Sequence, residues 1–135
     1  METSRILIVA YRTAATPGLI EEVRARAARA SAAFTLLVPR PYWDPDTEEA
    51  ALILELAIPL LEDAAGGHVE ALIGDADPAV AVRELFERER FDEVIVSTLP
   101  ARVSRWLHRD LPSRVRELGV PVTVVTAKEA VRPLP

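Results

Sequence analysis

The sequence is most informative at Gly74-Asp75-Ala76-Asp77-Pro78-Ala79 and, after an amphipathic segment, at Phe91-Asp92-Glu93-Val94-Ile95-Val96-Ser97. Asp77 followed by Pro78 predicts the start of a helix, because aspartate caps free N–H groups and proline fits the first helical position. Val82, Leu85 and Phe86 then recur at helical spacing. The apolar run that follows is short and β-branched, which is typical of a buried strand. These residues therefore predict a helix that leads directly into a strand of the core.

The same alternation extends along the whole chain. Apolar runs predict strands at 5–11, 34–38, 68–73, 93–98 and 121–126, of which 68–73 is the weakest. They are mostly continuous rather than alternating, which favours a parallel sheet covered on both faces. We therefore predict an α/β fold with an open, doubly wound, Rossmann-like sheet of five parallel strands. We expect a single domain over 1–135, with its core at about 5–126 and a flexible tail at 127–135.

Helical patterns fill the gaps between these runs. A first helix is predicted from Pro17, capped by Thr16, and a last one from about Leu111 to Leu118, stopped by Gly119. Asp46 and Glu49 resemble a capping box that opens the second helix. Ala50, Leu54, Ala57, Ile58 and Leu61 form its apolar stripe, and we expect Pro59 to kink or break it.

Composition excludes several classes of protein. The chain has 135 residues and no cysteine, so disulfides, thiolate catalysis and cysteine-bound metals are excluded. The apolar run Ile6 to Ala10 is too short for a bilayer span or a secretion signal. We therefore expect a cytoplasmic protein with no membrane partner.

Charge is unevenly distributed along the chain. The net charge is −5, but residues 44–93 hold 15 acids against 3 arginines, a balance of −12. Residues 97–116 hold five arginines against one acid, a balance of +4. Such runs are usually solvated helix faces, although the second could also border an anion site. The basic segment is short and the chain is acidic overall, which argues against nucleic-acid binding.

The sequence resembles the universal stress protein family. The resemblance lies in the Gly74–Ala79 and Phe91–Ser97 segments, in the opening Ile6-Leu7-Ile8-Val9-Ala10 and in the closing Val120-Pro121-Val122-Thr123-Val124-Val125. It covers the chain from about Ile6 to Val125. It implies the strand order 3-2-1-4-5, a stress-associated role in the cytoplasm and, in many members, a homodimer.

The chain departs from the nucleotide-binding members of that family. Those members carry an aspartate after strand one, and this position falls at Tyr11 here. They also carry a loop after strand four of the form glycine, two residues, glycine, nine residues, glycine, then serine or threonine. Its glycines would fall at Ser97, Pro100 and Asp110, and no residue from 97 to 118 is glycine. Glycine lets backbone N–H groups approach phosphate closely, so we expect a divergent member without the usual mode of ATP binding.

Polar residues at the ends of strands one and four are the remaining candidates for a ligand site. In open α/β sheets ligands bind beyond the carboxyl ends of the strands. Arginine binds phosphate or carboxylate with two parallel hydrogen bonds. Arg102, Arg105 and Arg109 would share a face if this stretch were helical, although they could instead pair with acids of the second helix or face solvent. The predicted ligand-binding residues are Tyr11, Arg12, Thr13, Ser97, Thr98, Arg102 and Arg105.

Other assignments are less consistent with the residues. A phosphoacceptor receiver domain would use Asp75 or Asp77, Thr98 and Lys128, but Tyr11-Arg12 replaces the acidic pair that would hold Mg²⁺. No Walker loop, GxGxxG or GxSxG motif occurs, and His68 and His108 lack metal-ligand spacing. We therefore expect no metal, no cofactor and no enzymatic activity.

Two aromatic pairs remain open to more than one interpretation. Tyr42 and Trp43 could pack over the crevice or cover a subunit contact, and Trp106 with Leu107 could be a hydrophobic plug or a stacking platform.

Two functional hypotheses follow from the sequence. The first is a non-catalytic domain of stress response that acts through homodimerisation and partner contacts. The second is a sensor that binds a nucleotide or a small phosphate or other anion in the crevice between strands one and four. The dimer is expected through the fifth strand, where Val122 and Val124 would form an apolar sheet edge.

Overall fold

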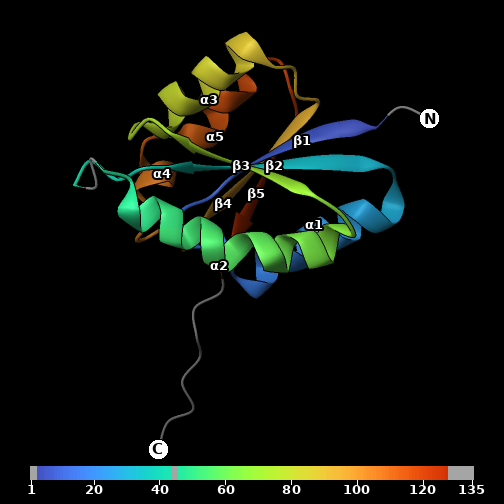
Figure 1. Ribbon diagram of the computed structural model, residues 1–135. Coiled ribbons are helices and arrows are strands. Elements are labelled where there is room, and N and C mark those ends of the chain that lie inside the picture. Colours follow the sequence, from blue (N-terminus) through green and yellow to red (C-terminus); the bar gives the residue numbers. More distant parts are fainter. Residues whose placement is uncertain (1–2, 44–45, 128–135) are drawn as a thin grey trace, which may run out of the picture.

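The computed structural model describes residues 3–43 and 46–127. Its five strands form one parallel sheet in the order β3-β2-β1-β4-β5, which confirms the predicted fold class and strand order (Figure 1). The strands are β1 (Ser4–Val9), β2 (Ala32–Pro39), β3 (Val69–Gly74), β4 (Glu93–Thr98) and β5 (Val122–Thr126).

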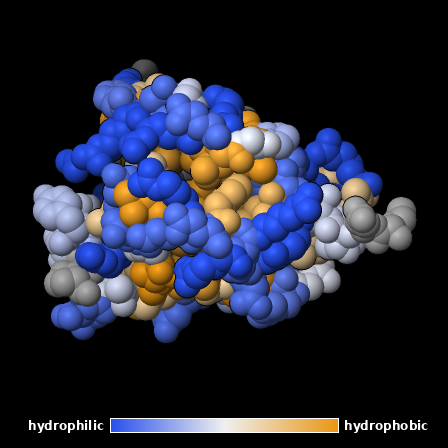
Figure 2. All heavy atoms as spheres, turned by 90° about the horizontal axis from the view of Figure 1, so that it is seen from above, coloured by the Kyte–Doolittle hydropathy of each residue, from blue (hydrophilic) through white to orange (hydrophobic). Residues whose placement is uncertain are grey.

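Helices cover both faces of the sheet. α1 (Pro17–Arg29) and α2 (Glu48–Ala65) lie together on one face. α3 (Pro78–Arg88), the short α4 (Arg105–His108) and α5 (Leu111–Arg116) lie on the other, as Figure 1 shows. Figure 2 looks onto this second face, where hydrophilic side chains surround a central group of hydrophobic ones.

The core consists of two apolar layers, one on each side of the sheet. Successive side chains of a strand point to opposite faces, so Ile6 and Ile8 join the layer under α1 and α2. Leu7 and Val9 join the layer under α3 and α5. Because both faces of β1 are buried, its sequence is continuously apolar rather than alternating.

The helix starts were only partly predicted. Asp77 caps α3 as expected, since its Oδ1 accepts hydrogen bonds from the N–H groups of Ala79 (2.9 Å) and Val80 (3.4 Å). The capping box proposed at Asp46 and Glu49 is wrong. Thr47 occupies the cap position of α2 in the left-handed region at φ 60° and makes no side-chain cap hydrogen bond.

Pro59 does not break α2, which excludes one of the two outcomes expected of it, a break or a kink. The helix runs through it without interruption from Glu48 to Ala65. Pro59 lies on the exposed side, where water can satisfy the carbonyl group that loses its N–H partner. Ala57 and Leu61 on either side of it are fully buried and hold the helix on the sheet.

The sheet has two edges, β3 and β5. Residues 128–135, which include Lys128 and most of the predicted tail, lie outside the described residues. Within the described part of the chain, no helix combines the length and the apolar character that crossing a bilayer demands.

Candidate functional site

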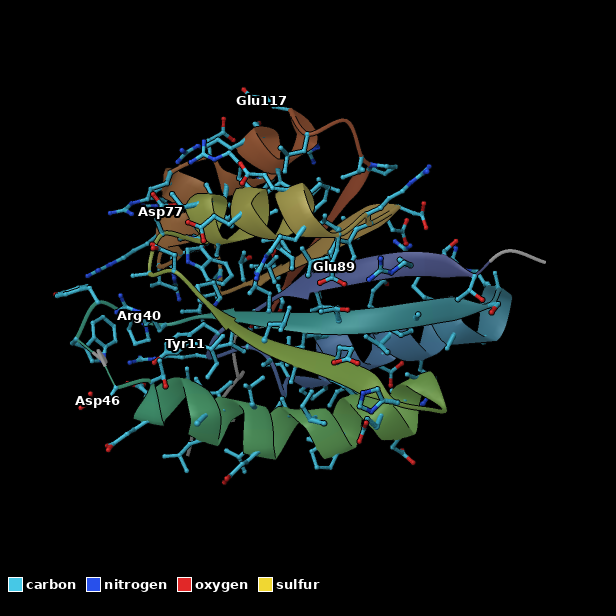
Figure 3. All side chains as sticks on the ribbon, turned by 45° about the horizontal axis from the view of Figure 1, so that its top comes forward. Tyr11, Arg40, Asp46, Asp77, Glu89 and Glu117 are labelled. Atoms are coloured by element: carbon cyan, nitrogen blue, oxygen red, sulfur yellow. The ribbon has the colours of Figure 1, made fainter. Side chains whose placement is uncertain are left out.

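A cavity of about 430 Å³ opens at the carboxyl ends of the strands. Its walls come from the segments that follow β1, β2, β3 and β4, so it lies where ligands bind in open α/β sheets. In Figure 3, Tyr11 and Arg40 lie at this end of the sheet, between the start of α2 and Asp77 at the start of α3. The lining residues are Tyr11, Arg12, Thr13, Pro39, Arg40, Pro41, Tyr42, Trp43, Ala76, Pro78, Ser97, Thr98, Leu99, Val103, Ser104, Arg105, Trp106 and Arg109.

The charged side chains that the structure describes in the lining of this cavity are all positive. They are Arg12, Arg40, Arg105 and Arg109, and Glu49 lies just behind the lining, close to Tyr11 and Trp43. Arg5, Arg24 and Arg26 elsewhere in the molecule pair with acids. Within residues 3–43 and 46–127, by contrast, none of the four cavity arginines forms an ion pair. A protein of net charge −5 therefore concentrates uncompensated positive charge in one hollow.

Hydroxyl groups from β4 and from the loop after β1 form the floor of the cavity. The Oγ atoms of Thr13 and Ser97 are 2.6 Å apart in a buried hydrogen bond that joins the two segments. Thr98 is 2 % exposed, and its Oγ1 has no hydrogen-bond partner within the described structure. A buried hydroxyl without a partner is costly, so a ligand that reaches Thr98 would gain a hydrogen bond.

Tyr11 lies where the family's aspartate would be expected. Its hydroxyl is buried and makes no hydrogen bond of good geometry with any described residue, although Glu49 and Arg12 lie close by. Burial, followed by the Glu49 carboxylate, raises the pKa of Tyr11 to about 12. The Arg12 guanidinium lowers this pKa, but by less. Tyr11 is therefore a neutral hydroxyl at physiological pH and supplies no negative charge to the cavity.

Aromatic side chains form the outer wall. The rings of Tyr42 and Trp43 meet edge to face with centroids 5.1 Å apart, and both line the cavity. The Nε1–H of Trp43 donates to Glu49 Oε2 at 2.9 Å, which ties this loop to the first turn of α2. This pair therefore borders the crevice, while its side chains are 74 % and 51 % exposed; the structure does not test the other interpretation, a subunit contact.

The segment after β4 has its own compact structure in place of a glycine loop. The N–H groups of Val103 and Ser104 both donate to the carbonyl of Pro100, at 2.9 and 3.0 Å. Ser104 Oγ accepts from the N–H of Leu107 and caps α4. These backbone donors are already used, so the positive groups left for a ligand here are side chains.

The predicted arginine face is only partly formed. Arg105 begins α4 and Arg109 ends it, and both line the cavity. Arg102 lies in the turn before the helix and is not a lining residue, so the idea of one helical face shared by all three arginines is wrong. The chain turns at Pro100 and starts a helix only at Arg105, which breaks the spacing on which that idea depended. Trp106 packs against the core under α3, as expected for a hydrophobic plug, and it also lines the cavity; the structure does not test its role as a stacking platform.

Six of the seven predicted ligand-binding residues line this one cavity, and Arg102 is the exception. Sequence reasoning missed Arg40, which follows β2, and did not include Arg109. A signal for Arg40 was present, because it follows a buried strand and any residue there reaches the same edge of the sheet.

The assignment as a phosphoacceptor receiver domain gains no support, since Asp77 caps α3 and Asp75 Oδ1 accepts from the N–H of Asp77. The third residue of that assignment, Lys128, lies outside the described residues.

Comparison with solved structures identifies the fold. The sequence matches no protein-family model and no curated protein. The structure is similar to a universal stress protein solved in complex with cAMP, with a TM-score of 0.71 and 14 % identity over 95 % of this chain and all of that one. It is also similar to a universal stress protein from Archaeoglobus fulgidus, with a TM-score of 0.65 and 14 % identity over 93 % of this chain and 95 % of that one.

The chain therefore has the fold of the universal stress proteins, a class of open α/β domains. Within that class it carries an arginine-lined cavity and, from residue 97 to 118, no glycine. At this level of identity the likeness establishes the fold, and the function has to be argued from the cavity.

Proposed function

We propose that this chain is a non-catalytic, divergent domain of the universal stress type, with a role in stress response, that binds a phosphate-bearing ligand in its arginine-lined cavity. The ligand is a nucleotide or a smaller phosphate anion. The observation that carries the proposal is the set of Arg12, Arg40, Arg105 and Arg109 around one hollow, with no acid among the lining residues of 3–43 and 46–127. Uncompensated guanidinium groups at the carboxyl end of a parallel sheet are suited to bind an anion.

Side chains would bind the ligand in place of a glycine loop. The backbone N–H groups of Val103 and Ser104 are bonded to Pro100, so the charge for a phosphate comes from the arginines. The unpartnered Thr98 hydroxyl offers one further hydrogen bond at the cavity floor. The neighbour solved in complex with cAMP supports the idea that this fold can hold a nucleotide.

The cavity lacks the groups that phosphoryl transfer or hydrolysis would use. Among the residues that the structure describes, the lining contains no carboxylate, histidine or lysine to act as a general base. The pKa of Tyr11, raised to about 12, keeps that hydroxyl protonated at neutral pH. Binding without turnover is the function that these side chains support.

Titration calorimetry with ATP, AMP, cAMP and inorganic phosphate tests the proposal. We expect at least one of these to bind, and we expect Arg105→Ala with Arg109→Ala to weaken it. Each lost charge-assisted hydrogen bond is worth about 1.5–3 kcal/mol, so affinity should fall by roughly ten- to a hundred-fold for each arginine.

Arg114→Ala with Arg116→Ala is the matched control. It removes the same charge from the exposed side of α5, away from the cavity lining, and should leave binding almost unchanged. Equal losses in the two double variants would show that only net charge matters and would contradict the proposal. Arg102→Ala tests separately the prediction from sequence that this side chain also contributes.

A homodimer through β5 is a second proposal, and it rests on a different observation. β5 forms one edge of the sheet and pairs only with β4 among the described strands. Val122 and Val124 on this edge are only partly buried. An apolar edge with free backbone groups favours pairing with another strand, and a second copy can satisfy it symmetrically.

A further inference from the structure

Helix α2 is much more apolar than its packing on the sheet requires. Residues 50–61 of α2 contain a single charged residue, Glu55. The sheet side of this stretch fully buries Ala50, Ala57 and Leu61. A helix that packs on one side normally carries polar residues on the other, so an apolar outer side needs an explanation.

The outer side of α2 presents three leucines in a row, which we call the leucine stripe. Leu52, Leu56 and Leu60 follow each other at four-residue spacing and so lie on one face of the helix. Their side chains are 60 %, 70 % and 45 % exposed. Figure 1 shows α2 on the outer side of its layer, with α1 packed beside it.

Acidic residues surround the leucine stripe. Glu48 precedes it, Glu55 lies between its leucines, and Glu62 and Asp63 follow it. Glu62 is bonded to His68 and to the N–H of Val69, and Asp63 is 3.6 Å from Arg24. Glu48 and Glu55 have no ion-pair partner among the described residues. The surface is therefore apolar along its centre and negative at its border.

We propose that the leucine stripe is a docking surface for a basic amphipathic helix of a partner protein. Such a helix would lay its apolar side on Leu52, Leu56 and Leu60 and its lysines or arginines beside Glu48 and Glu55. Recognition of an amphipathic helix by an apolar surface is a common mode of binding, and complementary charge selects the partner.

The charges favour this occupant over two others. A second copy of the chain would bring the same acids face to face, which costs free energy. A membrane surface carries anionic lipids, which the acidic border repels. The surface is also separate from the proposed dimer edge, since α2 packs on β2 and β3 and β5 is at the opposite edge of the sheet.

The test uses two synthetic peptides about 15 residues long, each with leucine at every fourth position. One carries lysine and arginine beside its leucines, and the other carries glutamate. Binding to the full chain is followed by titration calorimetry. The basic peptide should bind more tightly than the acidic one, and added salt should weaken it.

Two variants locate the binding surface. Leu52→Gln with Leu56→Gln should weaken the basic peptide by about tenfold or more, since leucine and glutamine have similar helix propensities and the fold should be retained. Glu48→Gln with Glu55→Gln should weaken it several-fold without touching the apolar contact. Glu84→Gln with Glu87→Gln on α3 removes the same charge elsewhere and should have little effect.

Each contrary result overturns the proposal. Equal binding of the two peptides would remove the charge argument, and no binding of the basic peptide would remove the docking surface itself. Unchanged affinity in both variants at positions 48–56 would place binding elsewhere. If the unmodified chain were a dimer and the Leu52→Gln, Leu56→Gln variant a monomer, the leucine stripe would be a contact between two copies instead. Binding to anionic vesicles that depends on the leucines would make it a membrane surface.

Discussion

Tyr11 shows how a single side chain sets the electrostatics of the cavity. Tyr11 occupies the position at which the family resemblance would place a negatively charged aspartate. Burial first and Glu49 second raise the pKa of the Tyr11 hydroxyl to about 12, so it carries no charge at neutral pH. Because Tyr11 stays neutral, it does not offset the positive charge of the Arg12 guanidinium, which lies 5.8 Å from the centroid of its ring.

The raised pKa of Tyr11 predicts a loss of stability at high pH. The folded pKa of about 12 lies above the ordinary tyrosine pKa of 10.0, so between these two values the folded chain binds more protons than the unfolded one. The free energy of unfolding should therefore fall as pH rises from about 10 to about 12, and no such effect is expected below pH 10. Tyr11→Phe should lessen this fall in denaturant unfolding measured across that range. Tyr42→Phe, which removes the other tyrosine hydroxyl, is the control; an identical pH profile for the Tyr11 variant would contradict the assignment.

Gly74 allows β3 and α3 to approach closely. A Cβ atom at this position would lie 2.8 Å from Ala81 Cβ and 2.9 Å from Leu37 Cδ1. Leu37 can rotate away, but Ala81 is held by its helix. Gly74→Ala should therefore destabilise the protein by about 1–3 kcal/mol.

Urea unfolding measures this cost, and Gly67→Ala is the matched control because a Cβ atom there would meet nothing within 4 Å. Equal stability of the two variants would mean that α3 can move away from β3 without a cost in free energy. The prediction of close packing at Gly74 would then be wrong.

At the scale of elements, the cap of α3 is the clearest link between sequence and structure. Asp77 accepts two backbone hydrogen bonds at the start of a helix that also borders the cavity through Pro78. Asp77→Ala should lower the free energy of unfolding by about 1 kcal/mol, while Asp77→Asn keeps an oxygen acceptor and should lose much less. Thermal unfolding of both variants measures these losses of stability. If Asp77 mattered only through its charge, Asp77→Ala and Asp77→Asn would lose the same stability, and the assignment as a cap would be wrong.

The start of α2 joins the cavity wall to the helix layer. Glu49 accepts from Trp43 and lies close to Tyr11, so one side chain of the first turn contacts two cavity residues. Thr47 at the cap position makes no side-chain cap hydrogen bond, so the Glu49 contacts are among those that hold this turn against the cavity wall. Glu49→Ala should therefore raise the mobility of Trp43, measured as faster quenching of its fluorescence by acrylamide. Trp106→Phe in both backgrounds isolates the Trp43 signal, since the chain has two tryptophans.

At the scale of the whole molecule, the proposed dimer would be built on β5. Val124→Lys places a charge on the strand edge and should shift the protein toward monomer while the sheet remains folded. Light scattering at tens of micromolar gives the mass of both forms, and circular dichroism verifies the fold of the variant. A monomeric unmodified chain at that concentration would overturn the proposal.

The elements could be read from the sequence because their signals are local. Strand runs, the cap at Asp77 and the stop near Gly119 each depend on a few neighbouring residues, and the structure confirms those strands and helices. A break at Pro59 does not occur, because packing of Ala57 and Leu61 on the sheet outweighs local preference. The cap position of α2 is Thr47, one residue later than the predicted cap. The turn at Pro100, which takes Arg102 away from the other arginines, likewise depends on how the chain leaves β4.

The order of elements, and with it the parallel sheet, can be predicted from the sequence itself, since continuous apolar runs that alternate with amphipathic helices favour a parallel sheet covered on both faces. The sequence also determines that no glycine loop follows β4. Tertiary structure alone decides that Arg12, Arg40, Arg105 and Arg109 share one cavity, and that the leucine stripe is left uncovered. The physical reason is that these arginines come from three segments far apart in the chain, and only the pairing of β2, β1 and β4 side by side brings their carboxyl ends to one edge.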